Sequence, residues 1–239
     1  MNNDTDTGRA GVPPPAAPVG SRVPRDRPLC GRFVTLEGGE GGGKSTQAKR
    51  LAAALEARGI DVLLVREPGG TPLGEKVRPL IKDQLEDPPC DRCELLLFLA
   101  ARAQLVRNVI RPALAAGRWV VSDRFSDSTI AYQGYGRGLP LDAVAAANDF
   151  ACEGLRPDLT LLLDVSPETA AERMRGREAA THTAADRIEL AGDAFHARLR
   201  EGFAALAKGE PGRIRVIDAN GAPDEVWAKI WNEVGEIIE

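Results

Sequence analysis

Histidine is scarce in this sequence, with two among 239 residues. General acid–base catalysis and activated serine or cysteine nucleophiles most often depend on a histidine. Both histidines lie in the C-terminal third, and the chain offers no Ser-His-Asp or Cys-His arrangement. The acid–base repertoire of the chain is therefore thin.

Cysteine is too sparse to build a disulfide framework. The four cysteines (Cys30, Cys90, Cys93 and Cys152) are scattered, which favours a reducing compartment and predicts a cytoplasmic protein. Cys90 and Cys93 form a C-x-x-C pair, but a zinc site needs a second pair of ligands, and the remaining candidate ligands are isolated. We interpret the pair as local packing.

Long hydrophobic runs and an excess of positive charge are also missing. The most apolar run, Leu95–Ala101, has the length of a core segment, and the N-terminus lacks the apolar region of a secretory signal. With a net charge of −4, the chain lacks the excess of positive charge that is typical of nucleic-acid-binding proteins. With 43% hydrophobic and 28% charged residues, we expect a globular domain with neither a membrane nor a nucleic-acid partner.

A phosphate-binding loop is the strongest positive signal. An apolar run leads into Gly38-x-x-x-x-Gly43-Lys44-Ser45, and a run of good helix formers follows. This strand–loop–helix context is what a P-loop requires, so an incidental glycine-rich turn is the weaker interpretation. Lys44 would reach the β- and γ-phosphates of ATP, and Ser45 would ligate Mg²⁺. The predicted ATP-binding residues are Gly38, Gly39, Glu40, Gly41, Gly42, Gly43, Lys44, Ser45 and Thr46.

The order of the predicted elements indicates an α/β protein. Strand runs alternate with helical segments, which predicts a P-loop NTPase fold with a five-stranded parallel sheet and helices on both faces. Residues 1–29 form a proline-rich tail that we expect to be disordered, and residues 30–239 form one domain. A segment at about residues 173–188, rich in arginines and small residues, predicts a mobile lid.

Arginines gather around the predicted mouth of the sheet. Arg66 and Arg124 each follow a strand, at the edge where α/β sheets bind ligands. A second, anionic substrate facing ATP would explain them. Asp123 ends a strand in a Walker-B-like position, where it would act with Ser45 on the metal or its waters.

Phe98 and Arg102 lie four residues apart on one predicted helix and share a face, where they would offer a stacking ring beside a hydrogen-bonding fork. Phosphoryl transfer to a nucleoside monophosphate fits these features, because the acceptor phosphate, with a second pKa of about 6, needs no general base. The guanine-binding Asn-Lys-x-Asp signature is absent. A kinase for another pyrimidine monophosphate and a P-loop switch that transfers nothing are the alternatives.

Several longer motifs occur in order between residues 32 and 237. They are Phe33-x-x-x-Glu-Gly-x-x-Gly-x-Gly-Lys-Ser-Thr46, Arg66-Glu-Pro-Gly-Gly-Thr-Pro72, Leu97-Phe-Leu-Ala-Ala-Arg-Ala-Gln104, Asp123-Arg-Phe-x-x-Ser-Thr-x-Ala-Tyr-Gln-Gly134, Pro157-Asp-Leu-Thr-Leu-x-Leu-Asp164 and Asp186-Arg-Ile-Glu189. Together they resemble the thymidylate kinase family. The resemblance implies a nucleoside monophosphate kinase domain that converts ATP and dTMP to ADP and dTDP with Mg²⁺, as a cytoplasmic homodimer.

The resemblance also implies roles for individual residues. Arg66 and Arg124 would bind the dTMP phosphate, and Phe98 would stack on thymine. Glu40 would lie near the sugar. The groups expected to read the base edge are Arg102, Gln133 and Ser128 or Thr129.

Glycines at 42 and 43 resemble the bacterial type, whose catalytic arginine comes from the lid. Arg173, Arg175 and Arg177 are the candidates; we favour Arg177, which directly follows Gly176, and keep Arg175 as an alternative. Lys44 and Arg124 complete the predicted catalytic set.

Three further expectations concern local detail. Tyr132 has the bulk to crowd a 2′-hydroxyl and would select deoxyribose. The Glu67–Pro68 peptide is predicted to be cis by the resemblance. The dimer is expected to use apolar helix faces near Leu95 and Ile130.

Overall fold

The computed structural model describes residues 30–181 and 185–238 of the chain. Its centre is a five-stranded sheet with the order β2-β3-β1-β4-β5, in which every pairing is parallel. The strands are β1 (Phe33–Glu37), β2 (Val62–Arg66), β3 (Trp119–Asp123), β4 (Leu159–Asp164) and β5 (Ile214–Asp218). The predicted fold class and strand number are confirmed. The predicted tail, residues 1–29, lies outside the described residues.

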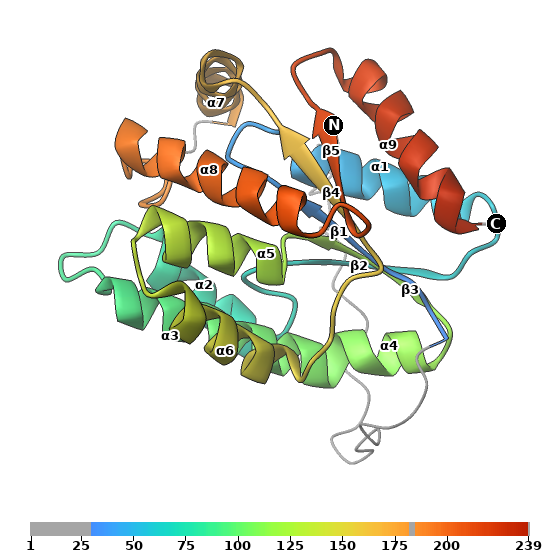
Figure 1. Ribbon diagram of the computed structural model, residues 1–239, viewed down its shortest axis with the longest axis horizontal. Coiled ribbons are helices and arrows are strands. Elements are labelled where there is room, and N and C mark those ends of the chain that lie inside the picture. The colour runs from blue at the N-terminus through green and yellow to red at the C-terminus, as the bar shows by residue number, and fades with distance from the viewer. Residues whose placement is uncertain (1–29, 182–184, 239) are drawn as a thin grey trace, which may run out of the picture.

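Helices cover both faces of this sheet (Figure 1). The helical elements are α1 (Lys44–Glu56), α2 (Pro72–Lys82), α3 (Asp91–Leu105), the π-helix η1 (Val106–Ile110), α4 (Arg111–Ala115), α5 (Ser126–Thr129), the π-helix η2 (Ile130–Gly136), α6 (Leu141–Cys152), α7 (Pro167–Thr181), α8 (Asp193–Gly209) and α9 (Pro223–Ile238). Helices α1 and α9 lie side by side on one face, and α3, α4, α6 and α8 lie on the other.

The alternation of side chains along β1 explains this layering. Val34 and Leu36 point into the core formed with α1 and α9, whereas Phe33 points into the core formed with η1 and α4. All five residues of β1 are buried. A central parallel strand that is buried on both faces cannot lie at a surface, so β1 fixes the position of the P-loop that follows it.

Helix α2 is an element that the sequence analysis did not identify. Thr71 caps it by accepting a hydrogen bond from the amide of Gly74 at 2.9 Å, and Pro72 occupies the first turn. Gly74 and Pro79 inside the helix obscure its pattern in the sequence. The helix matters for the site because it carries Arg78 and Lys82.

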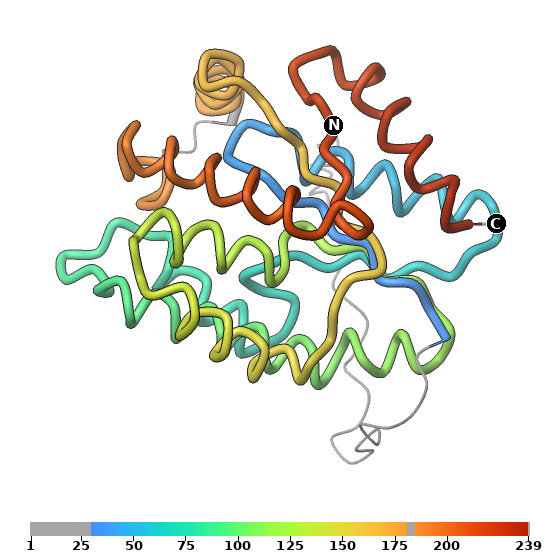
Figure 2. The backbone as a smooth tube through the Cα atoms, in the orientation of Figure 1, coloured from blue at the N-terminus to red at the C-terminus, as the bar shows by residue number. Residues whose placement is uncertain are grey.

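Much of the predicted lid segment is helical. Helix α7 continues to Thr181, so Arg173, Arg175 and Arg177 lie on this helix, and the mobility of the segment stays a prediction. Alanine, glutamate and arginine are good helix formers, and Gly176 is tolerated among them. The helix follows β4 and lies beyond the C-terminal end of that strand (Figures 1 and 2). Residues 182–184 of the predicted lid lie outside the described residues.

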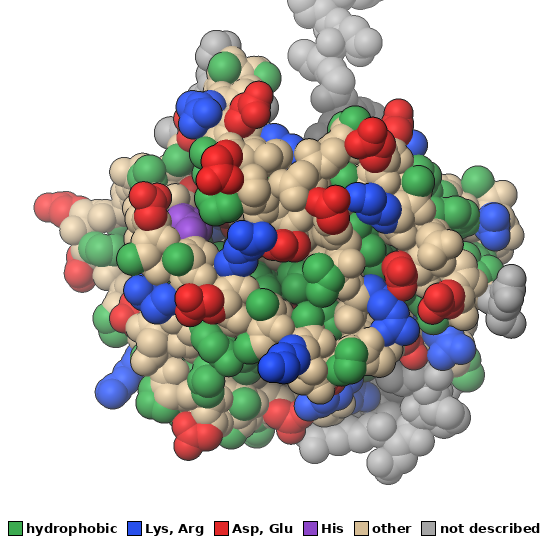
Figure 3. All heavy atoms as spheres, turned by 45° about the horizontal axis from the view of Figure 1, so that its top comes forward, with side chains coloured by type: hydrophobic (Ala, Val, Ile, Leu, Met, Phe, Trp, Pro, Cys, Tyr) green, Lys and Arg blue, Asp and Glu red, His purple; other side chains and the backbone are tan. Residues whose placement is uncertain are grey.

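No helix within residues 30–181 and 185–238 has the length and apolarity needed to cross a membrane. On the face shown in Figure 3, acidic and basic side chains are interspersed, and the basic ones do not gather into one large area.

Candidate active site

The P-loop follows β1 directly and depends on its glycines. Gly38 has φ 129°, and a Cβ there would lie 2.4 Å from the carbonyl oxygen of Leu163. Gly41 has φ 70°, and a Cβ there would lie 2.7 Å from the carbonyl oxygen of Ala170 on α7. Only glycine fits such a close approach with a left-handed backbone, so these two positions allow the loop to fold tightly between β4 and α7.

Lys44 lies at the start of α1 with 6% of its surface exposed. Its ammonium donates a hydrogen bond to the carbonyl oxygen of Gly39 at 2.6 Å, which spans the loop. Burial, with the positive charge of Arg124 added, lowers the pKa of Lys44 to about 8. An ammonium in this position is strongly favourable for a bound anion, because its charge is poorly solvated.

The predicted metal ligands meet beside this lysine. The hydroxyl of Ser45 donates a hydrogen bond to the carboxylate of Asp123 at the end of β3. Both groups line the P-loop cavity and are oxygen ligands, the kind that Mg²⁺ prefers. The donor set therefore fits the ion that the family resemblance implies.

A cavity of about 580 Å³ extends over the P-loop. Residues 40–46 of the predicted ATP-binding loop line it, and the carbonyl oxygens of Gly38 and Gly39 accept hydrogen bonds from Arg124 and Lys44. Its other walls carry the cationic side chains Arg66, Arg78, Lys82, Arg124, Arg173 and Arg177. Such a surplus of positive charge suits the phosphates of two substrates.

A second, narrower cavity of about 40 Å³ adjoins the first. Pro68, Phe98 and Tyr132 supply its apolar walls, and Ser128, Thr129 and Gln133 supply polar groups. Glu40, Glu67, Lys82 and Arg124 line both cavities. Lys82 and Asp186, which both line the narrower cavity, form an ion pair at 2.7 Å.

Arg124 connects the two cavities. Its guanidinium donates hydrogen bonds to the carbonyl oxygen of Gly38 at 2.9 Å and to the hydroxyl of Ser128 at 3.1 Å, and it forms an ion pair with Glu40. Burial alone would raise the pKa of Glu40, but Arg124 and then Lys44 lower it below its ordinary value. Glu40 is therefore ionised, and it orients Arg124.

Tyr132 forms the floor beside Glu40. Its hydroxyl donates a hydrogen bond to the Glu40 carboxylate at 3.0 Å, and its ring packs edge-on against Phe195 and Phe203. The Arg124 guanidinium lies over the same ring, 4.8 Å from its centroid. Burial raises the pKa of Tyr132 well above the ordinary value, so the phenol stays neutral.

Gln133 is held by a buried carboxylate. Its amide donates a hydrogen bond to Glu94 on α3 at 2.9 Å, and Glu94 also pairs with Arg137 and Arg187. Because Glu94 is only 1% exposed, these contacts fix both Gln133 and Arg187, which lies near the C-terminal end of the predicted lid. Gln133 also lines the narrow cavity.

Arg102 lies behind the wall of the narrow cavity and does not line it. Its side chain is 1% exposed, and its N–H groups bind Glu67, Thr129, Asn148 and the carbonyl oxygen of Phe125. These bonds occupy all five donors of the guanidinium. Hydrogen bonding to a base edge would require one of these bonds to be exchanged, so the structure does not bring Arg102 to the site as the sequence analysis expected. The Glu67–Pro68 peptide beside it is cis, as predicted.

The remaining arginines differ in their surroundings. Arg66 lines the larger cavity and pairs with Glu75 at 2.9 Å. Arg173 donates to the carbonyl oxygens of Gly41 and Gly221, which makes it a brace between α7 and the P-loop. Arg177 lines the larger cavity and pairs with Glu189 at 2.7 Å. Arg175 is exposed and does not line either cavity.

Sequence reasoning missed several residues of the site. Arg78 and Lys82 belong to the unrecognised helix α2, which Thr71 and Pro72 signal. The buried carboxylates Glu37, Glu67 and Glu94 hold the site arginines and polar side chains in place, but their partners lie 35 to 93 positions away in the chain. No local pattern identifies such pairs.

Comparisons with known proteins agree with this geometry. A sequence model of the family described as thymidylate kinase matches residues 36–230. The chain is 50% identical over 213 residues to a thymidylate kinase of Solidesulfovibrio magneticus, covering 86% of this chain and 100% of that protein. It is 49% identical over 210 residues to one of Rhizorhabdus wittichii, covering 88% and 100%.

A solved structure leads to the same family. The crystal structure of thymidylate kinase from Ehrlichia chaffeensis matches with a TM-score of 0.65 and 35% sequence identity, covering 85% of this chain and 98% of that chain. The family model covers most of the described domain, and about half of the positions are identical in full-length relatives. The chain belongs to the thymidylate kinase family.

Proposed function

We propose that the two adjoining cavities hold ATP and dTMP so that their phosphates meet at Arg124. The reaction is transfer of a phosphoryl group from ATP to dTMP, which gives ADP and dTDP. The observation that carries the arrangement is the position of Arg124, which lines both cavities and is fixed between the P-loop and Ser128. Donor and acceptor phosphates on either side of it would lie close enough for direct transfer.

The chain's own groups would work by position and charge. The acceptor oxygen of dTMP is already ionised, so no general base has to remove a proton. Lys44 and the P-loop amides would hold the donor phosphates, and Arg124 would neutralise charge between the two substrates. Phe98 would stack on the base, with Gln133, Ser128 and Thr129 hydrogen-bonding around it.

Ser45 and Asp123 would hold Mg²⁺. Their direct contact and oxygen chemistry support this assignment. When bound, the ion neutralises charge on the transferring phosphates.

One assay tests the substrate assignment. Purified protein is mixed with Mg-ATP and a panel of nucleoside monophosphates, and ADP formation is followed. We expect turnover with dTMP to exceed that with the other monophosphates. Equal rates on dTMP and dCMP would contradict the specificity, and no turnover on any acceptor would favour a P-loop switch.

Arg177→Ala is expected to lower kcat by about 10³-fold or more, the range for arginines that stabilise phosphoryl transfer, with little effect on KM. Arg177 lines the larger cavity from α7, whereas Arg173 braces backbone carbonyls. Arg173→Ala is expected to lower the melting temperature more than kcat. Steady-state kinetics and thermal melts check both variants. A normal Arg177→Ala beside a crippled, folded Arg173→Ala would reverse the assignment.

Tyr132→Ala is expected to abolish discrimination between dTMP and its ribo analogue. A crowded 2′-hydroxyl without a partner costs about 1–3 kcal/mol, which corresponds to about 10- to 100-fold in kcat/KM. Tyr132→Phe keeps the ring that packs against Phe195 and Phe203, so discrimination should survive. Tyr135→Ala serves as the control, because Tyr135 does not line the acceptor cavity. An unchanged ratio in Tyr132→Ala would exclude Tyr132 as the selecting group.

We also propose that the protein is a homodimer that works in the cytoplasm. The dimer surface expected near Leu95 and Ile130 stays a prediction, and Leu95 itself is 9% exposed and belongs to the core between α3 and α6. Leu96 on α3 and Phe150 on α6 are 63% and 87% exposed, and they support a dimer through this face. Sedimentation velocity measures the assembly, and a monomer at micromolar concentration would contradict it.

A further inference from the structure

Arg124 has a backbone conformation that few residues other than glycine adopt. Its φ is 74°, which costs about 1–3 kcal/mol and persists only where the surroundings enforce it. The peptide groups on both sides are held by hydrogen bonds. The amide of Arg124 donates to the carbonyl oxygen of Leu36 at 3.0 Å, and the amide of Phe125 donates to the carboxylate of Glu37 at 2.8 Å.

Glu37 extends this restraint to the guanidinium. The carboxylate is fully buried at the end of β1, and it also accepts hydrogen bonds from the amide and the hydroxyl of Ser128. The Ser128 hydroxyl in turn accepts from the Arg124 guanidinium. Helix α5 has no side-chain cap of its own, so Glu37 binds its first turn in place of one.

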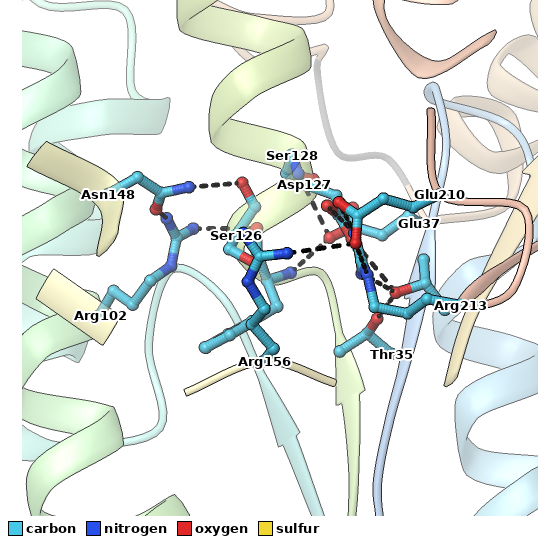
Figure 4. Close-up of polar contacts among 12 residues, drawn as sticks. Thr35, Glu37, Arg102, Ser126, Asp127, Ser128, Asn148, Arg156, Glu210 and Arg213 are labelled. Carbon is cyan, nitrogen blue, oxygen red and sulfur yellow. Dashed lines mark hydrogen bonds and ion pairs between the residues drawn. The ribbon is translucent and has the colours of Figure 1, made fainter. Parts of the chain in front are cut away.

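Asp127 anchors α5 at a second point. Its carboxylate accepts two hydrogen bonds from the guanidinium of Arg213, at 2.7 and 2.8 Å, and a third from the hydroxyl of Thr160 on β4 (Figure 4). The remaining donors of Arg213 bind Glu210 and the same Thr160 hydroxyl. Arg213 directly precedes β5, which is an edge strand of the sheet. This ion pair therefore connects α5 to that edge.

The two carboxylates that hold α5, Glu37 and Asp127, also influence each other electrostatically. Burial, and after it the negative charge of Asp127, raise the pKa of Glu37 to about 7. The positive charge of Arg213 lies directly on Asp127 and offsets that repulsion. Loss of Arg213 alone would therefore favour protonation of Glu37, because the negative charge of Asp127 would no longer be offset. Loss of both charges removes this electrostatic effect, so that only the loss of the α5 tether remains.

We propose that Arg213 is a positioning residue for the acceptor phosphate, acting through Asp127 and α5 to keep Arg124 in its strained conformation. Arg213 lines neither of the two substrate cavities. The inference rests on the role proposed above for Arg124.

The test removes both charges of the pair together. Arg213→Met alone leaves Asp127 buried without a partner and is expected to destabilise the fold, so the informative variant is the double substitution Asp127→Asn with Arg213→Gln. We expect KM for dTMP to rise by about tenfold, while KM for ATP changes less than about twofold. Arg215→Met is the matched control, because Arg215 pairs with Glu233 and Glu236, away from α5.

Amide hydrogen exchange gives a readout that does not depend on turnover. The amides of Phe125 and Ser128 should exchange about tenfold faster in the double variant than in the wild type or the Arg215→Met control. A folded double variant with unchanged exchange at these amides and an unchanged KM for dTMP would overturn the proposal. A purely structural role would lower the active fraction and leave both KM values unchanged. Wild-type protein that does not phosphorylate dTMP would contradict the proposed function, and the exchange rates would still decide whether Arg213 holds α5.

Discussion

Lys44→Ala is expected to lower kcat by at least about 10³-fold. The Lys44 ammonium lies in the floor of the larger cavity and crosses the P-loop to the carbonyl oxygen of Gly39. Bound triphosphate would add negative charge next to this buried cation, and the attraction would grow as charge develops during transfer. No other group in the loop can replace a positive charge at that point. Steady-state kinetics with dTMP and Mg-ATP measure the loss.

The fold should survive this substitution. Burial and the like charge of Arg124 both act against the Lys44 ammonium, as its lowered pKa of about 8 indicates. Removing the charge relieves that repulsion, so we expect the melting temperature to stay the same or rise. Lys49→Ala is the matched control, because Lys49 is an exposed lysine on the same helix. A Lys44→Ala variant within about threefold of the wild-type kcat would mean that the P-loop is not the transfer site.

The parts of this site that local sequence encodes were predictable. The P-loop can be recognised in the sequence because its glycines, lysine and serine must follow a strand and precede a helix in a fixed spacing. The sequence also predicted that a strand ends at Asp123, and β3 does end there. Both features depend on neighbours in the chain.

The supporting network was not predictable for the opposite reason. Arg102 reads as a surface or ligand-facing charge until Glu67, Thr129 and Asn148 are brought around it by the fold. The pairing of Asp127 with Arg213 joins residues 86 positions apart. The left-handed backbone conformation of Arg124 cannot be predicted from the sequence, because arginine has no preference for that conformation. Such contacts appear only when the sheet order is known.

Arg124→Ala is expected to lower kcat/KM for dTMP by about 10³-fold, with a smaller change in KM for ATP. The guanidinium lines both cavities and is fixed between Gly38 and Ser128, so its loss removes the contact between the donor and acceptor sites. Arg124→Lys keeps a charge but cannot bind Gly38, Ser128 and Glu40 at once, so it should recover only part of the activity. Steady-state kinetics with dTMP as the varied substrate measure kcat/KM for the wild type, Arg124→Ala and Arg124→Lys. Activity of Arg124→Ala within about threefold of wild type would exclude Arg124 as the acceptor group.

Arg124→Gly separates the chemical role of this residue from its backbone strain. Glycine adopts a φ of 74° without a clash, whereas alanine at that φ costs about 1 kcal/mol or more. The glycine variant should therefore be more stable than the alanine variant by about 1 kcal/mol in urea unfolding, yet equally inactive. Equal stability of the two variants would mean that the chain relaxes from the left-handed conformation once the guanidinium is gone. In that case the contacts of the Arg124 side chain would hold its backbone in place. The hydrogen bonds of Glu37 and the anchoring of α5 would not be sufficient to do so.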